Sequence, residues 1–305
     1  MTFTPLPSDF YGFEALLTDP EKELLARLRE YLETEIRPIV NDHWARAEFP
    51  MQLVDGLAKL GLFGMPWAEV RPFENSAVFR GWVALELARV DASVATLVGM
   101  QNGLVMGAVG VGGSDEQRAE WLPKFASGEW LGCFALTEPL SGSDSARGLR
   151  TTATRDGDGW VLNGEKRWIG NGTIASHAIV WAKSTEDGQV KGFLVPTSSA
   201  GWLASKIENK QALRIVQNAD IVLTDVRVPE ENRLQKADSF RDTAAVLRLT
   251  RAEVAWAAVG NSVGAYEAAV AYGAKREQFG ETIDNHQLIQ EHYARMLGNI
   301  TSSIA

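Results

Sequence analysis

The sequence has few residues of the kinds that cross-link a chain or hold a metal ion. Cysteine occurs once, at Cys133, and histidine occurs four times among 305 residues. A single cysteine excludes an intrachain disulfide and a cysteine-rich metal site, and it fits a reducing compartment. The histidines form no HExxH pair, since His286 and His292 are separated by five residues. The sequence therefore predicts no metal centre.

The chain also lacks a run of basic residues. It has 30 Lys and Arg against 39 Asp and Glu, which gives a net charge of −9 at pH 7. Without a basic stripe, nucleic acid is not expected as a partner. The N-terminus has neither a basic segment nor an Arg-rich amphipathic stretch, so we expect a cytoplasmic location. The apolar stretch 94–111 contains Gln101 and Asn102, so a buried helix is predicted there and no membrane span.

Three common functional signatures are missing. The glycines of 107–113 form no complete GxGxxG after a strand. Residues 159–165 have the spacing of a phosphate-binding P-loop, but Glu165 stands where lysine is required and would repel phosphate. No GxSxG element marks a hydrolase. These absences argue against a Rossmann dinucleotide site, a P-loop nucleotidase and a serine hydrolase.

Composition and periodicity divide the chain into three zones. Residues 1–130 have apolar positions at helical spacing and predict an N-terminal helical domain. Residues 131–238 are rich in Gly, Thr, Ser, Asp and Val, with turns such as Asp156–Gly159 between short apolar runs, and predict an antiparallel β domain. Residues 239–305 return to helical spacing and predict the first part of a C-terminal four-helix bundle. The predicted fold class is therefore α+β.

Several helix boundaries can be predicted from local signals. Thr18-Asp-Pro-Glu21 combines a capping residue, an early proline and a glutamate able to reach back to the cap. Pro38 comes late in the helix that begins at this motif and is expected to kink or end it. Uninterrupted helices are predicted over 92–110 and over 240–276. A last helix is predicted to start near residue 284 and to continue to the end of the chain.

Five ordered motifs resemble those of the acyl-CoA dehydrogenase family. They are Phe134–Asp144, Lys166–Asn171, Asp225–Asn232, Arg276–Gly280 and His286–Gln287. Because they extend in order over nearly the whole chain, the protein is identified as a member of this family. Within it, the chain is most similar to glutaryl-CoA dehydrogenases and to plant short-chain acyl-CoA oxidases. The resemblance implies a flavoprotein of fatty acid metabolism that binds FAD.

The resemblance also implies which residues hold the flavin. The backbone around Phe134 and Leu136 and the Thr137 hydroxyl are expected to bond the polar edge of the isoalloxazine. Trp168 and Ile169 are expected beside the ring, and Ser143 between the flavin and the thioester arm of CoA. Gly170 departs from most relatives, whose Thr or Ser hydroxyl bonds flavin N5. Its lack of a side chain changes the contact with N5 or leaves room near it, and access for oxygen is one consequence.

A second group of implied flavin residues lies near the C-terminal end. Arg276 resembles an arginine that reaches the flavin pyrophosphate of a neighbouring subunit, where its forked donors suit phosphate. Gln278, Phe279 and Gln287 accompany it. This arrangement implies a homotetramer built as a dimer of dimers.

The implied reaction is the α,β-dehydrogenation of an acyl-CoA thioester. A Glu carboxylate removes the α-proton while the β-hydrogen leaves as hydride to flavin N5. Thr96, Ser143, Leu247 and Arg251 are the implied substrate residues, and Arg251 also orients the catalytic carboxylate. The family's Tyr-Glu-Gly-Thr motif is missing and no Glu follows Glu291. We therefore expect the base beyond residue 305, and the 305-residue chain to be inactive alone.

The acyl group and the electron acceptor are less closely specified. Glutaryl-specific relatives carry an Arg at the position of Ala95, so a neutral short- or medium-chain acyl group is expected here. An electron-transfer flavoprotein is the expected acceptor. Two alternatives remain: an acyl-CoA oxidase that passes electrons to O2, and a non-catalytic scaffold that binds flavin or CoA.

Overall fold

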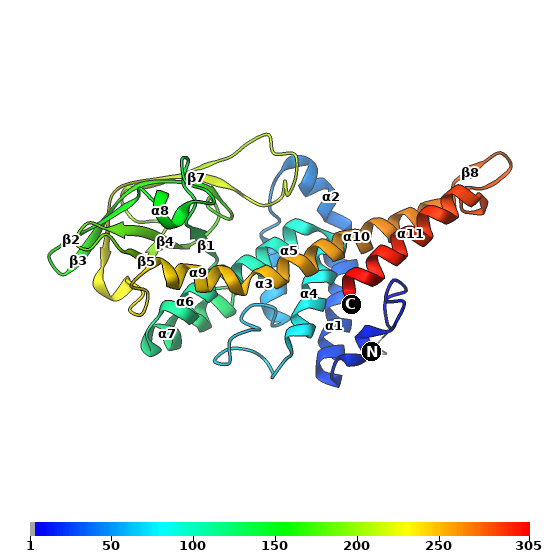
Figure 1. The fold of residues 1–305 in the computed structure, drawn as a ribbon, viewed down its shortest axis with the longest axis horizontal. Helices are drawn as coiled ribbons and strands as arrows, with labels where there is room; N and C mark the ends of the chain where they lie inside the picture. The colour runs from blue at the N-terminus through cyan, green and yellow to red at the C-terminus, as the bar shows by residue number, and fades with distance from the viewer. Residues whose placement is uncertain (1–3) are drawn as a thin grey trace. The chain divides into compact units, whose positions relative to one another are not determined.

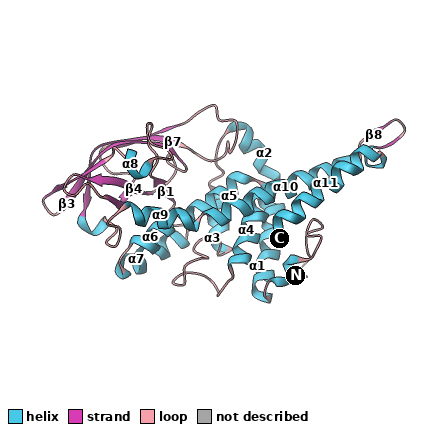
Figure 2. Ribbon diagram, in the orientation of Figure 1, coloured by secondary structure: helices cyan, strands magenta, loops and turns pink. Residues whose placement is uncertain are grey.

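The computed structural model describes residues 4–305 (Figure 1). The chain divides into two compact units. We call Asn41–Glu74 with Thr96–Arg251 the sheet unit. The helical unit combines Asn75–Ala95, Ala252–Ala305 and the N-terminal segment up to Val40. The division of the chain into domains at residues 130 and 238 stays a prediction. The mixed architecture, with helical segments before and after a central sheet, confirms the predicted fold class (Figure 2).

The sheet unit is built on a seven-stranded sheet in the order β1-β4-β2-β3-β7-β6, with β5 paired to β4. Four pairings are antiparallel, as predicted, but β1 and β2 each pair with β4 in parallel. Parallel neighbours need long connections, and such connections cannot be recognised from strand patterns alone. The strands are β1 Gly132–Ala135, β2 Thr152–Asp156, β3 Gly159–Ile169, β4 His177–Ser184, β5 Val190–Pro196, β6 Trp202–Lys206 and β7 Ala219–Pro229.

Helices and short helical turns complete the sheet unit. Buried apolar side chains from α6, α7 and α9 pack with residues of β1, β4 and β5 into one core cluster. A second cluster, which includes Trp160 and Phe193, lies within the strands themselves. The helical elements that lie wholly within this unit are α3 Gln52–Lys59, α6 Met106–Gly112, α7 Asp115–Ala126, α8 Ser145–Gly148, η4 Glu230–Asn232 and α9 Phe240–Leu249. Helices α2 Arg37–Arg46 and α5 Ala92–Gly99 each begin in the helical unit and end in the sheet unit.

The predicted helix over 92–110 contains a π-helical segment, η3 (Met100–Val105), between α5 and α6. The combined helix Ala92–Gly112 is long and apolar enough to cross a membrane, but 72% of its most apolar window is buried inside the protein. The polar side chains of the π-helical segment are paired with backbone groups outside it. Gln101 bonds the carbonyls of Phe125 and Trp130 and accepts the N–H of Gly132.

In the helical unit, the predicted start of the first helix is confirmed. Helix α1 (Asp19–Tyr31) begins with a capping box in which Thr18 and Glu21 bond each other's backbone. Pro38 neither ends nor breaks the chain of helices, because a π-helical segment (Leu32–Ile36) precedes it and α2 continues through it. The remaining elements are η1 Phe13–Leu16, α4 Ala77–Val90, α10 Arg251–Gly273, β8 Glu277–Gln278, β9 Glu281–Thr282, η5 Ile283–Asn285 and α11 Gln287–Ile304.

Helices α4 and α10 approach each other closely. A Cβ built on Gly260 would lie 2.2 Å from the carbonyl oxygen of Leu85, and one on Gly264 would lie 2.3 Å from that of Arg89. Neither position accepts a side chain without moving backbone. Farther along the same contact, Trp82 and Trp256 pack with ring centroids 5.7 Å apart.

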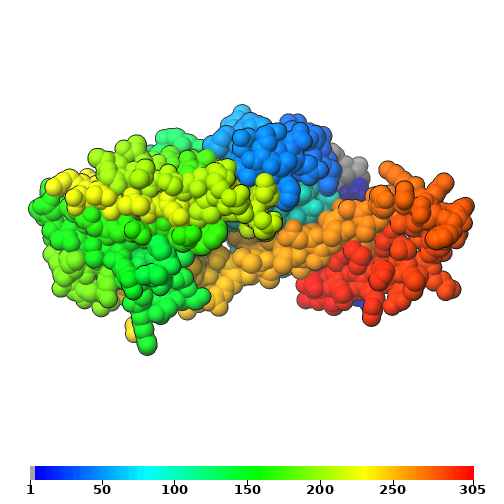
Figure 3. Space-filling view, turned by 90° about the horizontal axis from the view of Figure 1, so that it is seen from above, coloured from blue at the N-terminus to red at the C-terminus, as the bar shows by residue number. Residues whose placement is uncertain are grey.

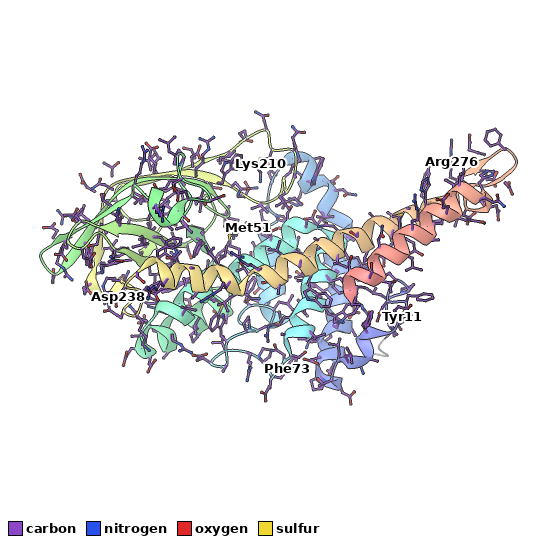
Figure 4. All side chains as sticks on the ribbon, viewed as in Figure 1. Tyr11, Met51, Phe73, Lys210, Asp238 and Arg276 are labelled. Atoms are coloured by element: carbon purple, nitrogen blue, oxygen red, sulfur yellow. The ribbon has the colours of Figure 1, made fainter. Side chains whose placement is uncertain are left out.

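The long helix predicted over 240–276 is interrupted at Thr250, which separates α9 from α10. Neither Gly nor Pro marks this break, so the prediction was wrong there. Helix α11 runs alongside the end of α10 (Figure 3), where the Tyr293 hydroxyl donates to the carbonyl of Ala269 at 2.9 Å. The β8–β9 hairpin that joins them carries Arg276 just before its first strand (Figure 4).

Candidate functional site

The predicted site residues fall into two groups, one in each unit. The sheet unit contains those expected at the isoalloxazine and the thioester. The helical unit contains those expected at the pyrophosphate. The first group is Phe134, Leu136, Thr137, Ser143, Trp168, Ile169, Gly170, Thr96, Leu247 and Arg251, and the second is Arg276, Gln278, Phe279 and Gln287.

The exit from β1 is bonded directly to the end of β3. The Arg167 backbone N–H donates to the Thr137 carbonyl at 2.8 Å, so residues from two separate motifs are neighbours. Phe134 and Leu136 are buried in the core cluster below, whereas Thr137 is half-buried. Within residues 4–305, the Thr137 hydroxyl has no recorded hydrogen bond. It is therefore available to a ligand.

A fully buried lysine holds this junction. The Lys166 ammonium donates to the carbonyls of Leu136 at 3.1 Å and Trp181 at 2.7 Å, and to Oε1 of Glu138 at 2.9 Å. Burial lowers the pKa of Lys166 to about 8, although the Glu138 carboxylate opposes that shift. Glu138 also accepts the N–H groups of Arg150 and Thr151. Its bonds to Lys166 and Thr151 hold its pKa below the usual value despite burial.

Trp168 has a backbone conformation that is unusual for a large side chain. Its φ is +62°, in the left-handed region, and the residue is 52% exposed. A register shift in the pairing of β3 with β7 lies between Lys166 and Ile169, and Asn218 donates to the Trp168 carbonyl at 3.1 Å. The bulge and this bond turn the ring out of the core, while Ile169 stays buried. Strained positions of this kind cluster at binding sites.

The loop after β1 is tightly closed at its base and open at its tip. Glu138 and Ser141 exchange backbone hydrogen bonds of 2.9 and 3.1 Å. Beyond them Leu140 is 74% exposed, and a Cβ added to Gly142 would meet no atom within 4 Å. Ser143 is exposed, and within residues 4–305 its hydroxyl has no recorded hydrogen bond. The loop thus presents a free hydroxyl.

Gly170 follows Trp168 at the end of β3, where the side chain of Met100 lies against it. A Cβ added to Gly170 would lie 3.0 Å from Sδ and 3.2 Å from Cε of Met100. Met100 is the first residue of the π-helical segment η3, and it belongs to the same core cluster as Phe134 and Leu136. The space beside Gly170 is therefore filled from the helix.

The predicted substrate residues of the sheet unit lie on α5 and at the α9–α10 junction. Thr96 is half-buried, one helical turn before Met100. Leu247 packs against the core cluster that contains Met100 and Phe134. Arg251 is exposed at the start of α10. Leu247 and Met100 thus share one apolar cluster, whereas Thr96 lies one turn before Met100 on the same helix and Arg251 is exposed at the α9–α10 junction.

The residues of the second group lie at the tip of the α10–α11 hairpin. Phe279 is 97% exposed with φ of +56°, and Arg276 and Gln278 are also exposed. Gln287 begins α11. Within residues 4–305, no carboxylate lies within ion-pair distance of Arg276. An exposed arginine without an ion-pair partner is suited to an anionic group from outside the hairpin.

Sequence reasoning missed Glu138, Lys166 and Met100 as site residues. Glu138 and Lys166 stand inside the quoted motifs, but only the structure reveals that they bond each other. The signal that would have indicated Met100 is the amide pair that follows it. Asn102 donates to the Leu62 carbonyl and accepts the Gly64 N–H, so both amides are fixed and the π turn with them.

A cavity of about 530 Å³ lies elsewhere in the sheet unit. None of its lining residues is a predicted site residue. Burial together with the Lys124 charge lowers the pKa of His177 in its wall to about 4, and the His177 ring stacks on Trp130 at 3.8 Å. The cavity lining includes Glu116, Glu120, Lys124, Trp130, His177 and Glu231.

The geometry of the sheet unit fits a flat, polar-edged ring. An exposed indole, free hydroxyls and a rigid strand junction lie in the segments where the resemblance places the isoalloxazine. Hydroxyl and backbone donors suit the polar edge of a flavin, and an indole suits its face. We therefore retain Thr137, Ser143 and Trp168 as the residues that would hold FAD.

Comparison with known proteins agrees with the sequence motifs. Three sequence profiles match: the acyl-CoA dehydrogenase N-terminal domain over residues 18–129, its middle domain over 133–226 and its C-terminal domain over 240–304. The rat mitochondrial short-chain specific acyl-CoA dehydrogenase is 33% identical over 285 residues, which are 92% of this chain and 69% of that protein. A Bacillus subtilis acyl-CoA dehydrogenase is 33% identical and matches 92% of this chain and 75% of its own length.

Solved structures show the same relationship. A glutaryl-CoA dehydrogenase from Mycobacterium smegmatis in complex with FADH2 superposes with a TM-score of 0.92 at 35% identity, and the match covers 99% of this chain and 77% of that one. The butyryl-CoA dehydrogenase of Megasphaera elsdenii gives a TM-score of 0.87 at 29% identity, with 94% and 77% covered. The family prediction is confirmed: this chain belongs to the acyl-CoA dehydrogenase family.

Proposed function

We propose that the protein carries out FAD-dependent α,β-dehydrogenation of an acyl-CoA thioester. The observation that carries this proposal is the backbone bond from Arg167 to Thr137, which joins the two motifs that contain the Thr137 hydroxyl and the exposed Trp168. The solved relative that contains FADH2 supports the choice of cofactor. Bound FAD supplies the two-electron acceptor, whose N5 receives the β-hydrogen as hydride.

The residues of the sheet unit orient the flavin and the substrate. Backbone groups at Phe134 and Leu136 and the Thr137 hydroxyl bond the polar edge of the ring, and Trp168 and Ile169 lie beside it. Ser143 bonds both the flavin and the thioester arm. Thr96 and Leu247 line the acyl side, where apolar walls exclude water. Donors to the thioester oxygen stabilise the enolate character that develops as the α-proton leaves.

The base is proposed to be a Glu carboxylate, which takes the α-proton, and Arg251 is proposed to orient that carboxylate. Arg276, with Gln278, Phe279 and Gln287, binds the pyrophosphate of a neighbouring subunit's FAD within a homotetramer. The exposure of Arg276 at a hairpin tip supports this role, because it leaves the guanidinium free for an anion.

The substrate is proposed to be a neutral short- or medium-chain acyl-CoA. Ala95 is 7% exposed, and a distal carboxylate buried beside it would lack the cation that stands there in glutaryl-specific relatives. The short-chain and butyryl-specific relatives support this size. An electron-transfer flavoprotein is the proposed acceptor, in the cytoplasm.

An acyl-CoA oxidase is the second candidate, because Gly170 offers flavin N5 no side-chain hydroxyl. Both candidates are tested by one substrate screen. The full-length protein is assayed with butyryl-, octanoyl- and glutaryl-CoA, once with an artificial electron acceptor and once with O2 while H2O2 is measured. We expect a neutral acyl-CoA to give a kcat/KM at least about tenfold above that of glutaryl-CoA, on the scale of one unpaired buried charge.

A preference for glutaryl-CoA contradicts the substrate proposal. Stoichiometric H2O2 at a comparable rate identifies an oxidase. Lack of turnover with every acyl-CoA leaves the scaffold alternative.

A further inference from the structure

The space beside Gly170 is occupied by a residue of another element. A Cβ at this position would lie 3.0 Å from Met100 Sδ, 3.2 Å from Met100 Cε and 3.6 Å from Val216 Cγ1. Carbon and sulfur atoms in ordinary contact lie about 3.5–4.0 Å apart. A side chain on residue 170 would therefore require the Met100 thioether to move by a few tenths of an ångström.

Met100 is buried at the start of a helical segment that is itself fixed by hydrogen bonds. It is 6% exposed and begins the π-helical segment η3. The next two residues, Gln101 and Asn102, lock that segment with buried bonds to the carbonyls of Phe125, Trp130 and Leu62. Single π turns inside α-helices are frequent at functional sites. The register of this helix thus presents the thioether to Gly170.

Met100 also connects the proposed flavin residues of the sheet unit with its proposed substrate residues. It packs in one core cluster with Phe134 and Leu136 of the proposed flavin strand, and Leu247 of the proposed substrate wall packs against that cluster. Methionine fills irregular gaps well because it is unbranched and flexible. A gap left by the missing side chain at residue 170 is such a place.

We propose that Met100 is a residue of the flavin site that fills the space left by Gly170 and closes it to O2. This inference rests on the proposed function, since it requires the flavin beside the end of β3. Where O2 gains entry, it takes two electrons and two protons from the reduced flavin, which becomes oxidised, and leaves as H2O2. The glycine alone therefore does not make the protein an oxidase, because the thioether excludes O2 from this side.

The packing part of the proposal is tested on the flavin-free protein. Gly170→Ala brings its new Cβ against Met100, so its melting temperature should fall by about 2–4 °C or more, the shift of a 1 kcal/mol change in a chain of this size. In a Met100→Ala background the same substitution should lower the melting temperature by less than half as much. Equal shifts in both backgrounds contradict the proposed pairing. Because no flavin is present, failure of the proposed function does not affect this result.

The second test measures re-oxidation of the reduced flavin without substrate. The holoprotein is reduced photochemically under anaerobic conditions and mixed with buffer of known O2 content in a stopped-flow instrument. We expect Met100→Ala to accelerate the return of flavin absorbance at least about tenfold, which corresponds to 1.4 kcal/mol in the barrier. Met100→Leu, which keeps most of the volume, should stay within about twofold of the wild type.

Met100→Val is the companion variant, because it removes the thioether with a smaller loss of packing and should also accelerate re-oxidation. An unchanged rate in Met100→Ala and Met100→Val contradicts the role in O2 exclusion. If Met100→Ala does not retain FAD, the rate in Met100→Val decides. A wild-type protein that binds no FAD at all contradicts the proposed function, and the melting series still decides whether Met100 and Gly170 form a pair.

Discussion

The Lys166 ammonium lies 2.9 Å from Oε1 of Glu138, with both side chains buried. The pair connects β3 to the loop that follows β1, and the same ammonium also bonds the carbonyls of Leu136 and Trp181. One side chain thus fixes three backbone segments at the junction proposed to hold the flavin. Its removal should therefore affect both stability and flavin binding.

We expect Lys166→Met to destabilise the protein by about 3–5 kcal/mol, because it leaves the Glu138 carboxylate buried without its cation. The double variant Lys166→Met with Glu138→Gln removes both charges and should recover at least half of that loss. Chemical denaturation of the flavin-free proteins measures both values. A double variant that is as unstable as Lys166→Met would mean that the pair is not the source of the effect.

Trp168 offers a test of whether its backbone strain serves binding. Trp168 has a φ of +62° and is about half exposed. Because glycine adopts this backbone conformation without strain, Trp168→Gly should leave the flavin-free protein as stable or more stable by about 1 kcal/mol. The same change should weaken FAD binding at least about tenfold, because the indole face is lost. Leu213→Gly, at φ of +48° in the same unit, is the matched control and should leave FAD affinity unchanged. Undiminished affinity in Trp168→Gly would remove this residue from the site.

Glu253 on α10 is expected to make the protein less stable as the pH rises. Burial raises its pKa from 4.5 to about 7, and the charge of Arg80 only partly opposes this. Between these two values the folded protein keeps a proton that the unfolded chain has released, so stability falls as the pH rises from about 4.5 to about 7, and the loss persists above. Glu253→Gln should therefore be more stable than wild type at pH 8, by about 1–3 kcal/mol, and no more stable at pH 4.5.

Glu267→Gln is the control for that series. Glu267 is on the same helix, but it pairs with Arg89 at 2.9 Å, so its loss should not stabilise the protein at pH 8. Thermal unfolding of both variants across the pH range gives the comparison. A Glu253→Gln gain that is equal at both pH values would show that the ionisation of Glu253 is not the cause.

Arg276 is proposed to bind the flavin of a neighbouring subunit. Arg276→Ala should raise the FAD dissociation constant at least about tenfold and shift the protein toward smaller assemblies, since a charge-assisted phosphate bond is worth about 1.5–3 kcal/mol. Flavin fluorescence and analytical ultracentrifugation measure the two effects. Arg295→Ala, an exposed arginine on α11 that pairs with Glu291, should change neither. Loss of FAD with an intact assembly would place Arg276 at a flavin but not between subunits.

The sequence predicted elements that carry a local signal, and missed those set by tertiary contacts. The Thr18–Glu21 capping box and the strands around Asp156–Gly159 are local, and both were confirmed. The break at Thr250 has no local signal. Helix α9 packs on α6 in the sheet unit, whereas α10 packs on α4 in the helical unit. The spacing of apolar residues along one helix does not reveal such a change of packing partner.

The same distinction holds for the candidate site. Thr137, Ser143 and Trp168 could be predicted as site residues because they stand inside recognisable motifs. Lys166 was overlooked because nothing local distinguishes a buried lysine from an exposed one on a strand. Met100 was overlooked because its role depends on Gly170, which is far along the chain and brought near only by the fold. A contact between two positions that are far apart in the sequence can be recognised only from the structure.

Flavin binding tests the central claim most directly. The purified full-length protein is freed of cofactor and titrated with FAD, and separately with NAD, while tryptophan and flavin fluorescence and visible absorbance are followed. We predict saturable binding of one FAD per chain with a shifted flavin spectrum, no binding of NAD, and weaker binding in Trp168→Gly and Arg276→Ala. A protein that shows no flavin band after FAD addition and removal of free cofactor would contradict the assignment of the site.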